Sequence, residues 1–102
     1  MERAWGRYRL TDLLNDLVLA CDPGERLVIS ASTWTIGAEQ ALAFAGHWTG
    51  KGKWLLRELR DLDAALADRW LSAHGVPDAV AAFTREVLDR AGGPLFDGFH
   101  AG

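Results

Sequence analysis

The sequence predicts a small α/β domain in which four helices surround a short two-stranded parallel sheet, built as a βαβ unit. Apolar residues recur at helical spacing through most of the chain. The densest run of β-branched residues, at 26–33 (RLVISAST), follows a Pro-Gly turn and indicates a buried strand. Because the chain has 102 residues and no internal repeat, we expect a single domain over residues 1–102.

A first helix is predicted over residues 8–21. Its apolar positions fall on one stripe, and Asp22-Pro23-Gly24 provides a turn that ends it. The stripe consists of Leu10, Leu13, Leu14, Leu17, Val18 and Cys21. The place of Cys21 on this stripe predicts a small buried hydrophobic residue.

The strand at 26–33 is followed by a predicted helix over 37–48. Thr35 can serve as its N-cap, and glycines from Gly46 onward mark its end. In the strand, Leu27 and Ile29, or alternatively Val28, should face a core.

Two interpretations are open for residues 51–74. Taken alone, the apolar spacing predicts one long helix. A lone strand would leave backbone groups unpaired, however, and its partner could be 53–59 (KWLLREL), 7–10, 95–99 or another copy of the chain. Only 53–59 gives a βαβ unit, so we predict a strand there and a helix over 61–74.

The last helix is predicted over 77–91, with Pro77 in its first turn and Gly92-Gly93-Pro94 after its end. A stripe of apolar residues, including Val80, Phe83 and Val87, supports it. Residues 93–102 form a Gly-containing tail that we expect to be mobile.

A family resemblance rests on the strand that ends in STWTIG (32–37), a Gly-Lys-Gly-Lys stretch at 50–53, an apolar run and a helix ending Ala73-His74-Gly75. With these features, residues 8–80 resemble the first lobe of a phospholipase-D-like family of phages and mobile elements. The resemblance implies that the apolar run after the basic stretch is a strand.

Catalysis in that family needs a histidine nucleophile with a lysine two positions later, because the lysine binds the phosphate that the imidazole attacks. None of the three histidines, His47, His74 and His100, has that lysine. The chain therefore resembles the scaffold lobe alone, and we predict no catalytic residues.

Composition excludes further chemistry. A single cysteine, Cys21, allows no internal disulfide and no Cys-rich zinc site. The histidines lie far apart, with no carboxylate at metal-ligand spacing, so we predict no metal site. A near match to a phosphate-binding loop at 45–52 has Gly52 where a hydroxyl residue should hold magnesium. We therefore predict no cofactor.

Charge and hydropathy limit the partners. The net charge is −3, from 11 basic and 14 acidic residues, which makes nucleic acid a weaker candidate than protein. No stretch is apolar enough to span a membrane, and the start of the chain lacks the pattern of a secretory signal. We expect a cytoplasmic protein with no membrane partner.

Five tryptophans are the anomaly of the composition. Trp34 and Trp70 can be placed in a core, whereas Trp5, Trp48 and Trp54 lie near element ends, where full burial is harder. We expect at least one of these three to be exposed, as an anchor for a partner. The predicted partner-binding residues are Trp48, Trp54, Lys51, Lys53 and Arg57.

The predicted function is a non-enzymatic protein-binding module, an accessory protein of a phage or mobile element that binds or inhibits a host protein complex. Its partner is another protein or a second copy of itself, as a dimer. One alternative is a degenerate or half-site phosphodiesterase completed by another chain. A nucleic-acid-binding accessory protein is the other, and it requires the basic patch at 51–60 to join Arg3, Arg7 and Arg9 on one face.

Overall fold

The computed structural model describes residues 2–93, with side chains from Trp5 onward, and this part of the chain consists of helices joined by loops, without a strand. The helices are α1 (Glu2–Leu19), α2 (Pro23–Phe44), α3 (Lys53–Leu62), α4 (Ala64–Ala73) and α5 (Pro77–Arg90). The predicted α/β fold with a parallel sheet is therefore wrong: the described residues form a helical bundle.

The first helix begins earlier and ends sooner than the predicted 8–21. Leu10, Leu14 and Leu17 of its stripe are buried, as predicted. Val18 is about half exposed (48%), and Cys21 lies beyond the helix end with its thiol exposed. The predicted burial of Cys21 is wrong because the helix stops before the stripe reaches it.

The predicted strand 26–33 lies inside α2. The carboxylate of Asp22 accepts a hydrogen bond of 2.8 Å from the Glu25 backbone N–H, and Pro23 occupies the first turn. This is the N-terminal signature of a helix, so the Asp-Pro-Gly segment begins α2 as well as ending α1. Leu27 and Val28 are exposed.

The predicted helix 37–48 is the second half of the same helix. Thr35, expected as its N-cap, lies in mid-helix, where its hydroxyl approaches the Ala31 carbonyl at 3.4 Å. The helix ends at Phe44, so Trp48 belongs to the following loop.

The predicted strand 53–59 is also helical, as part of α3. The helical periodicity of 51–74 was correct except for a break at Asp63, whose backbone is extended (φ −163°, ψ 103°). Asp63 ends α3 and caps α4, since its carboxylate accepts a 3.0 Å hydrogen bond from the Leu66 N–H. The helix predicted over 61–74 is confirmed for Ala64–Ala73.

The helix predicted over 77–91 is confirmed as α5, with Val80, Phe83 and Val87 buried. The mobile tail predicted at 93–102 lies outside the described residues, except for Gly93. The carbonyl of Gly93 accepts hydrogen bonds from two nitrogens of the Arg7 guanidinium, at 2.8 and 3.1 Å.

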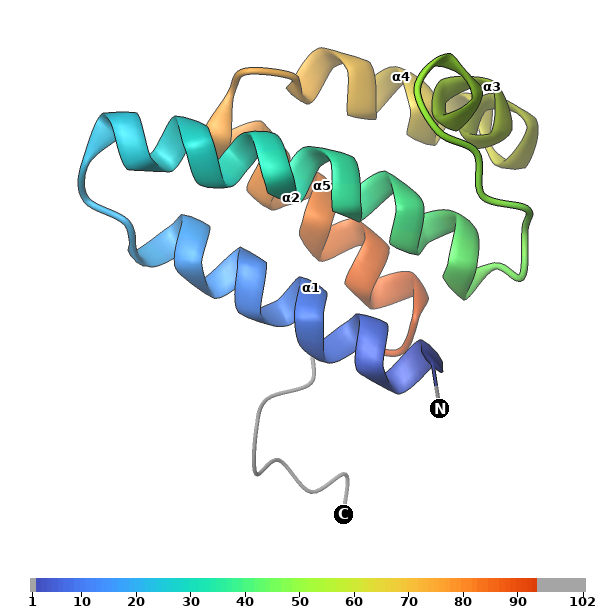
Figure 1. Cartoon of the computed structure of the whole chain (residues 1–102), viewed down its shortest axis with the longest axis horizontal. Helices are drawn as coiled ribbons and strands as arrows, with labels where there is room; N and C mark the ends of the chain where they lie inside the picture. Colours follow the sequence, from blue (N-terminus) through green and yellow to red (C-terminus); the bar gives the residue numbers. More distant parts are fainter. Residues whose placement is uncertain (1, 94–102) are drawn as a thin grey trace.

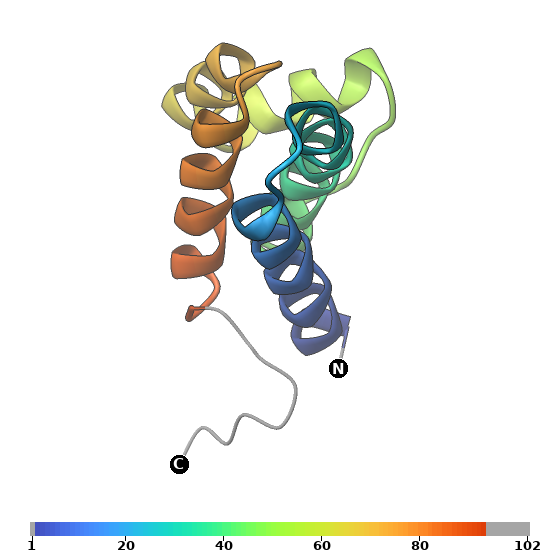
Figure 2. The same ribbon diagram turned by 90° about the vertical axis from the view of Figure 1, so that its left-hand side faces the viewer.

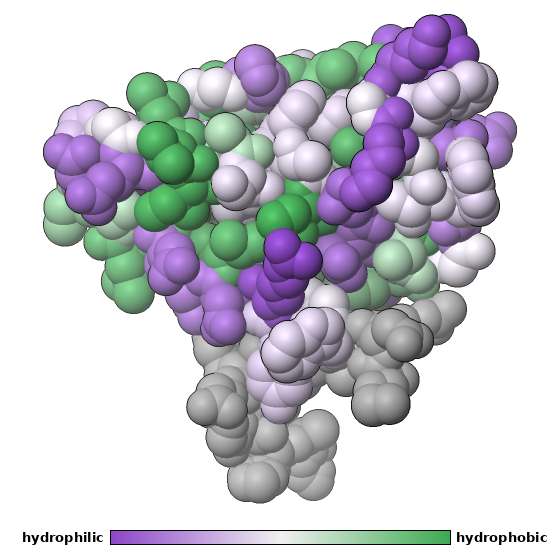
Figure 3. Space-filling model, viewed as in Figure 1, coloured by the Kyte–Doolittle hydropathy of each residue, from purple (hydrophilic) through white to green (hydrophobic). Residues whose placement is uncertain are grey.

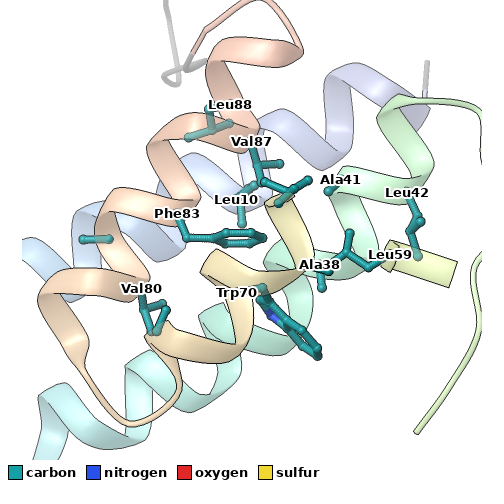
Figure 4. Close-up of a cluster of buried hydrophobic side chains, with 14 of the residues drawn as sticks. Leu10, Ala38, Ala41, Leu42, Leu59, Trp70, Val80, Phe83, Val87 and Leu88 are labelled. Carbon is teal, nitrogen blue, oxygen red and sulfur yellow. The ribbon is translucent and has the colours of Figure 1, made fainter. Parts of the chain in front are cut away.

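Helices α1, α2 and α5 pack against one another (Figure 1). The α3 and α4 pair packs against α2, and α4 also contacts α5. Figure 2 shows this pair on the side of α2 away from α1. Every helix contributes side chains to one buried cluster (Figure 4), which includes Leu10, Ala38, Leu42, Leu59, Trp70, Phe83 and Leu88.

Candidate functional site

The five predicted binding residues lie in the loop between α2 and α3 and in the first turns of α3. Gly46 adopts a positive φ (69°) after the end of α2, and the His47 N–H bonds the Leu42 carbonyl at 2.8 Å. These are the features of a glycine C-cap, which turns the chain away from the helix axis. The loop therefore leaves α2 in a defined direction toward α3.

Trp48 is 70% exposed and Trp54 is 48% exposed. Trp5, on α1, is 71% exposed. The prediction that at least one of these tryptophans is exposed is confirmed, and so is the burial of Trp70, which is 3% exposed. Trp34 is partly buried and packs against the core.

Trp54 is packed closely by Gly50 at its Cβ and backbone and by Arg57 at its indole. A Cβ atom added to Gly50 would come within 2.6 Å of the Trp54 Cβ and 2.9 Å of its backbone carbonyl carbon, so only glycine fits there. The Arg57 guanidinium lies over the indole, 4.7 Å from the ring centre, in a cation–π contact. Trp54 thus presents a half-exposed ring in a fixed setting.

Three cationic residues lie within three positions of one or the other of these two tryptophans in the chain. Lys51, Lys53 and Arg57 are all exposed. The Lys51 ammonium lies 3.4 Å from the Glu39 carboxylate and stays 87% exposed. Figure 3 shows hydrophilic side chains at the upper right, where Figure 1 places α3 and the loop before it. A locally basic surface therefore lies on a chain whose net charge is −3.

His47 ties the loop to α3. Its Nδ1 lies 3.1 Å from the Trp48 carbonyl oxygen and 3.4 Å from the Glu58 carboxylate, and its Nε2 lies 3.2 Å from the Asp61 carboxylate. The hydrogen bond to the Trp48 carbonyl raises the pKa of His47; Asp61 and Glu58 add to the rise, and burial opposes it. The loop is thereby fastened next to Trp48.

The meeting of these three side chains, His47, Glu58 and Asp61, was not predicted from the sequence. Glu58 and Asp61 are three residues apart in α3, which places them on one face of that helix. The prediction placed Glu58 in a strand at 53–59 and Asp61 at the start of a separate helix at 61–74, so their shared helix face was not foreseen. The approach of His47 from a loop leaves no mark in local spacing. Among the described residues, these three are the group whose side chains could hold a metal ion.

The basic patch does not join the arginines of α1. Helix α1 packs on α2 and α5, away from α3. Arg7 uses its guanidinium to bond the Gly93 carbonyl. The single basic face that the nucleic-acid alternative requires is therefore not formed by the described side chains.

Two open hollows lie elsewhere. A groove of about 360 Å³ between α4 and α5 is lined mainly by apolar atoms, with Phe83 and Ala73 among its residues. A shallower hollow of about 540 Å³ lies at the start of α2, beside Val28 and Ile29. Neither contains any of the predicted binding residues.

Apart from the two exposed tryptophans, an exposed apolar surface lies where α1 ends and α2 begins. Figure 3 shows hydrophobic side chains gathered over that left-hand part of the molecule. Its members are Val18, Leu19, Leu27 and Val28, of which Leu19 (76%) and Val28 (70%) are the most exposed. Such surfaces suit protein contacts but do not identify a partner.

No described helix has both the length and the apolar character needed to cross a membrane. The two strands that a phospholipase-D-like lobe needs are helical in this chain. Comparison with known protein families, curated proteins and solved structures finds no match.

Proposed function

We propose that the chain is a non-enzymatic protein-binding module whose contact surface consists of Trp48, Trp54, Lys51, Lys53 and Arg57. The observation that carries the proposal is the exposure of Trp48 (70%) and Trp54 (48%). Leaving indoles in water forgoes burial on the order of 200 Å² each, which a partner could recover. Tryptophan and arginine are also the residues that dominate protein interfaces.

The charge of this surface indicates the kind of partner. Arg57 packs over the Trp54 ring, and the exposed Lys51 and Lys53 lie close to the two tryptophans in the chain, so the complementary surface is acidic with an apolar pocket. In a symmetric dimer centred here, the same cations would face their own copies. A different, acidic protein is therefore favoured over a second copy of the chain.

The rigidity of the surface also supports binding. Arg57 packs over the Trp54 ring, Gly50 packs closely against the Trp54 backbone, and His47 fastens the loop to α3. A surface that is already ordered loses little conformational entropy when it binds.

Covering an acidic face of a host complex would make such a module an inhibitor in a phage or mobile element. The exposed thiol of Cys21 favours a reducing compartment, in keeping with a cytoplasmic location.

The experiment compares three forms of the purified chain: wild type, W48A/W54A and W5A. Trp5 is as exposed as Trp48 but lies on α1, so W5A is the matched control. Each form is used to capture proteins from nuclease-treated host lysate. Captured candidates are then purified and titrated by calorimetry. We expect W48A/W54A to bind at least about tenfold more weakly, a loss of about 1.4 kcal/mol or more, and W5A to bind like wild type.

Charge reversal tests the chemistry of the partner. K51E/K53E should slow association, and raising the salt concentration should weaken wild-type binding. The proposal fails if no purified protein depends on the two indoles. It also fails if the dependent species is a nucleic acid, or if W48A/W54A dissociates a dimer of the chain itself in sedimentation experiments.

A further inference from the structure

We propose that His47, Glu58 and Asp61 form a binding site for a divalent transition-metal ion, with Zn²⁺ the best fit. The site adjoins the indole surface but shares no side chain with it, and the inference does not depend on the proposed function. One imidazole and two carboxylates are a donor set that suits zinc, and three protein ligands leave one position open.

The ligand atoms are already close together. One atom can be chosen from each of the three side chains so that all lie within 4.8 Å of one another. The His47 Nε2 and the Asp61 carboxylate oxygen are 3.2 Å apart. Neighbouring ligands of a tetrahedral ion with bonds of about 2.1 Å lie about 3.4 Å apart, so Nε2 and the Asp61 oxygen are already near this spacing. The Glu58 carboxylate lies 3.4 Å from Nδ1, the other ring nitrogen, and its side chain must rotate toward Nε2 to complete the set.

The hydrogen bond made by the Nδ1 of His47 decides which ring nitrogen would bind the metal ion. The Trp48 carbonyl oxygen can only accept, so the Nδ1 at 3.1 Å from it must carry the proton. In the neutral ring, Nε2 then holds a lone pair, and this lone pair faces the Asp61 oxygen at 3.2 Å. Two acceptors at that distance repel unless a cation lies between them, and the cation is either a proton or a metal ion.

A backbone carbonyl on the far nitrogen is also the usual support of a histidine ligand. It fixes the tautomer and the orientation of the ring, and it makes Nε2 a better donor. The Trp48 carbonyl supplies this support here. The site therefore has a ligand set and an orienting outer partner.

Burial fits an ion that enters from solvent. The side chains of His47 and Glu58 are about one-fifth exposed, at 22% and 20%, so water is partly excluded from their ligand atoms. Asp61 is 77% exposed and leaves an open path. Ligands from the loop and from α3 would then be joined by the ion, which fastens the loop more firmly than a proton does.

The test titrates Zn²⁺ into the C21S chain by calorimetry, because the exposed Cys21 thiol is itself a soft zinc ligand. We expect one ion per chain. H47A and D61N should each weaken binding at least about tenfold, while H74A/H100A, which removes the other two histidines, should bind like the C21S parent. Circular dichroism checks that every variant is folded.

Amide NMR spectra locate the ion. Zn²⁺ should shift signals from residues 46–49 and 57–62 and leave those of α1 unchanged. The proposal is overturned if Zn²⁺ leaves these signals in place, which would mean that His47 holds only a proton. It is equally overturned if H47A retains binding or H74A/H100A loses it.

Discussion

Trp34 and Trp70 join α2 to α4 through two reciprocal hydrogen bonds. The Trp34 indole N–H donates to the Trp70 carbonyl at 2.6 Å, and the Trp70 indole N–H donates to the Trp34 carbonyl at 2.8 Å. The rings lie 3.9 Å apart and nearly parallel, and His74 meets Trp34 edge-on. Both indole donors are satisfied inside the protein, so these residues combine a large buried area with a fixed geometry.

Replacing Trp70 should therefore be costly. Because Trp70 is 3% exposed, W70A should lower the free energy of unfolding by about 3–5 kcal/mol, through the lost burial and the cavity left behind. Urea denaturation followed by circular dichroism measures the change. W5A is the control, since Trp5 is 71% exposed and its loss should cost less than about 0.5 kcal/mol. Equal effects of the two substitutions would contradict this assignment of core and surface.

The mistaken strand at 26–33 shows how an element can be misjudged. β-branched residues cost only about 0.5 kcal/mol each in a helix relative to alanine, a penalty that packing easily offsets. Thr33 is buried, and its hydroxyl donates to the Ile29 carbonyl at 2.8 Å. The capping pattern of Asp22, Pro23 and Glu25 could have been recognised in the sequence, but it was interpreted as a turn.

The error at 53–59 followed from the first one. A strand at 26–33 required a partner, and this requirement overruled the helical spacing of Leu55, Leu59 and Leu62. The spacing alone predicts α3 and most of α4. The spacing could not predict the break at Asp63. The apolar residues of α3 and α4 face the same core on both sides of the break, so the helical pattern continues through it.

The turn between α4 and α5 depends on Gly75, whose φ is +76°. No neighbouring atom lies within 4 Å of a Cβ added there, so a side chain meets only backbone strain. G75A should lower the free energy of unfolding by about 1–2 kcal/mol. G75N should cost less, because asparagine tolerates this conformation better than alanine does. Thermal and urea unfolding of the two variants check the order, and an alanine that costs no more than asparagine would contradict it.

Across the whole molecule, a group of ion pairs joins the α3–α4 junction, α4 and α5. Arg90 lies 2.8 Å from the Asp63 carboxylate and 3.2 Å from that of Glu86, and Glu86 also accepts from Arg69. The Leu66 N–H, followed by Arg90, lowers the pKa of Asp63. The hydrogen bond from Arg69 is the main cause of the lowered pKa of Glu86.

This network makes stability depend on pH in one direction. Carboxylates whose pKa is lower in the folded state add stability above their unfolded pKa, and this stability is lost as the pH falls through the folded pKa. The urea midpoint should therefore fall as the pH drops below about 4. D63N/E86Q should reduce this acid dependence, with D12N on α1 as the control. An unchanged dependence in the double variant would show that other groups cause it.

For the whole molecule, the sequence predicts which residues are buried better than it predicts how the elements are arranged. Periodicity correctly places Leu10, Leu59, Trp70 and Val87 inside, because burial follows spacing whichever helices meet. Exposure of Trp48 and Trp54 was also predictable, from the glycines and lysines around them. The cluster of His47 with α3 was not, since it depends on how a loop returns to a helix.

The stacked pair of Trp34 and Trp70 also has an optical consequence. Two parallel indoles 3.9 Å apart couple their electronic transitions, and the coupling falls steeply with distance. Held rigidly in an asymmetric setting, such a pair gives a near-ultraviolet circular dichroism band that freely moving indoles lack. The band exists only while α2 and α4 remain in contact, so the chain carries a built-in spectroscopic reporter of that contact. Since Trp48 and Trp54 lie outside the pair, ligands bound at their surface can be titrated without removing the reporter.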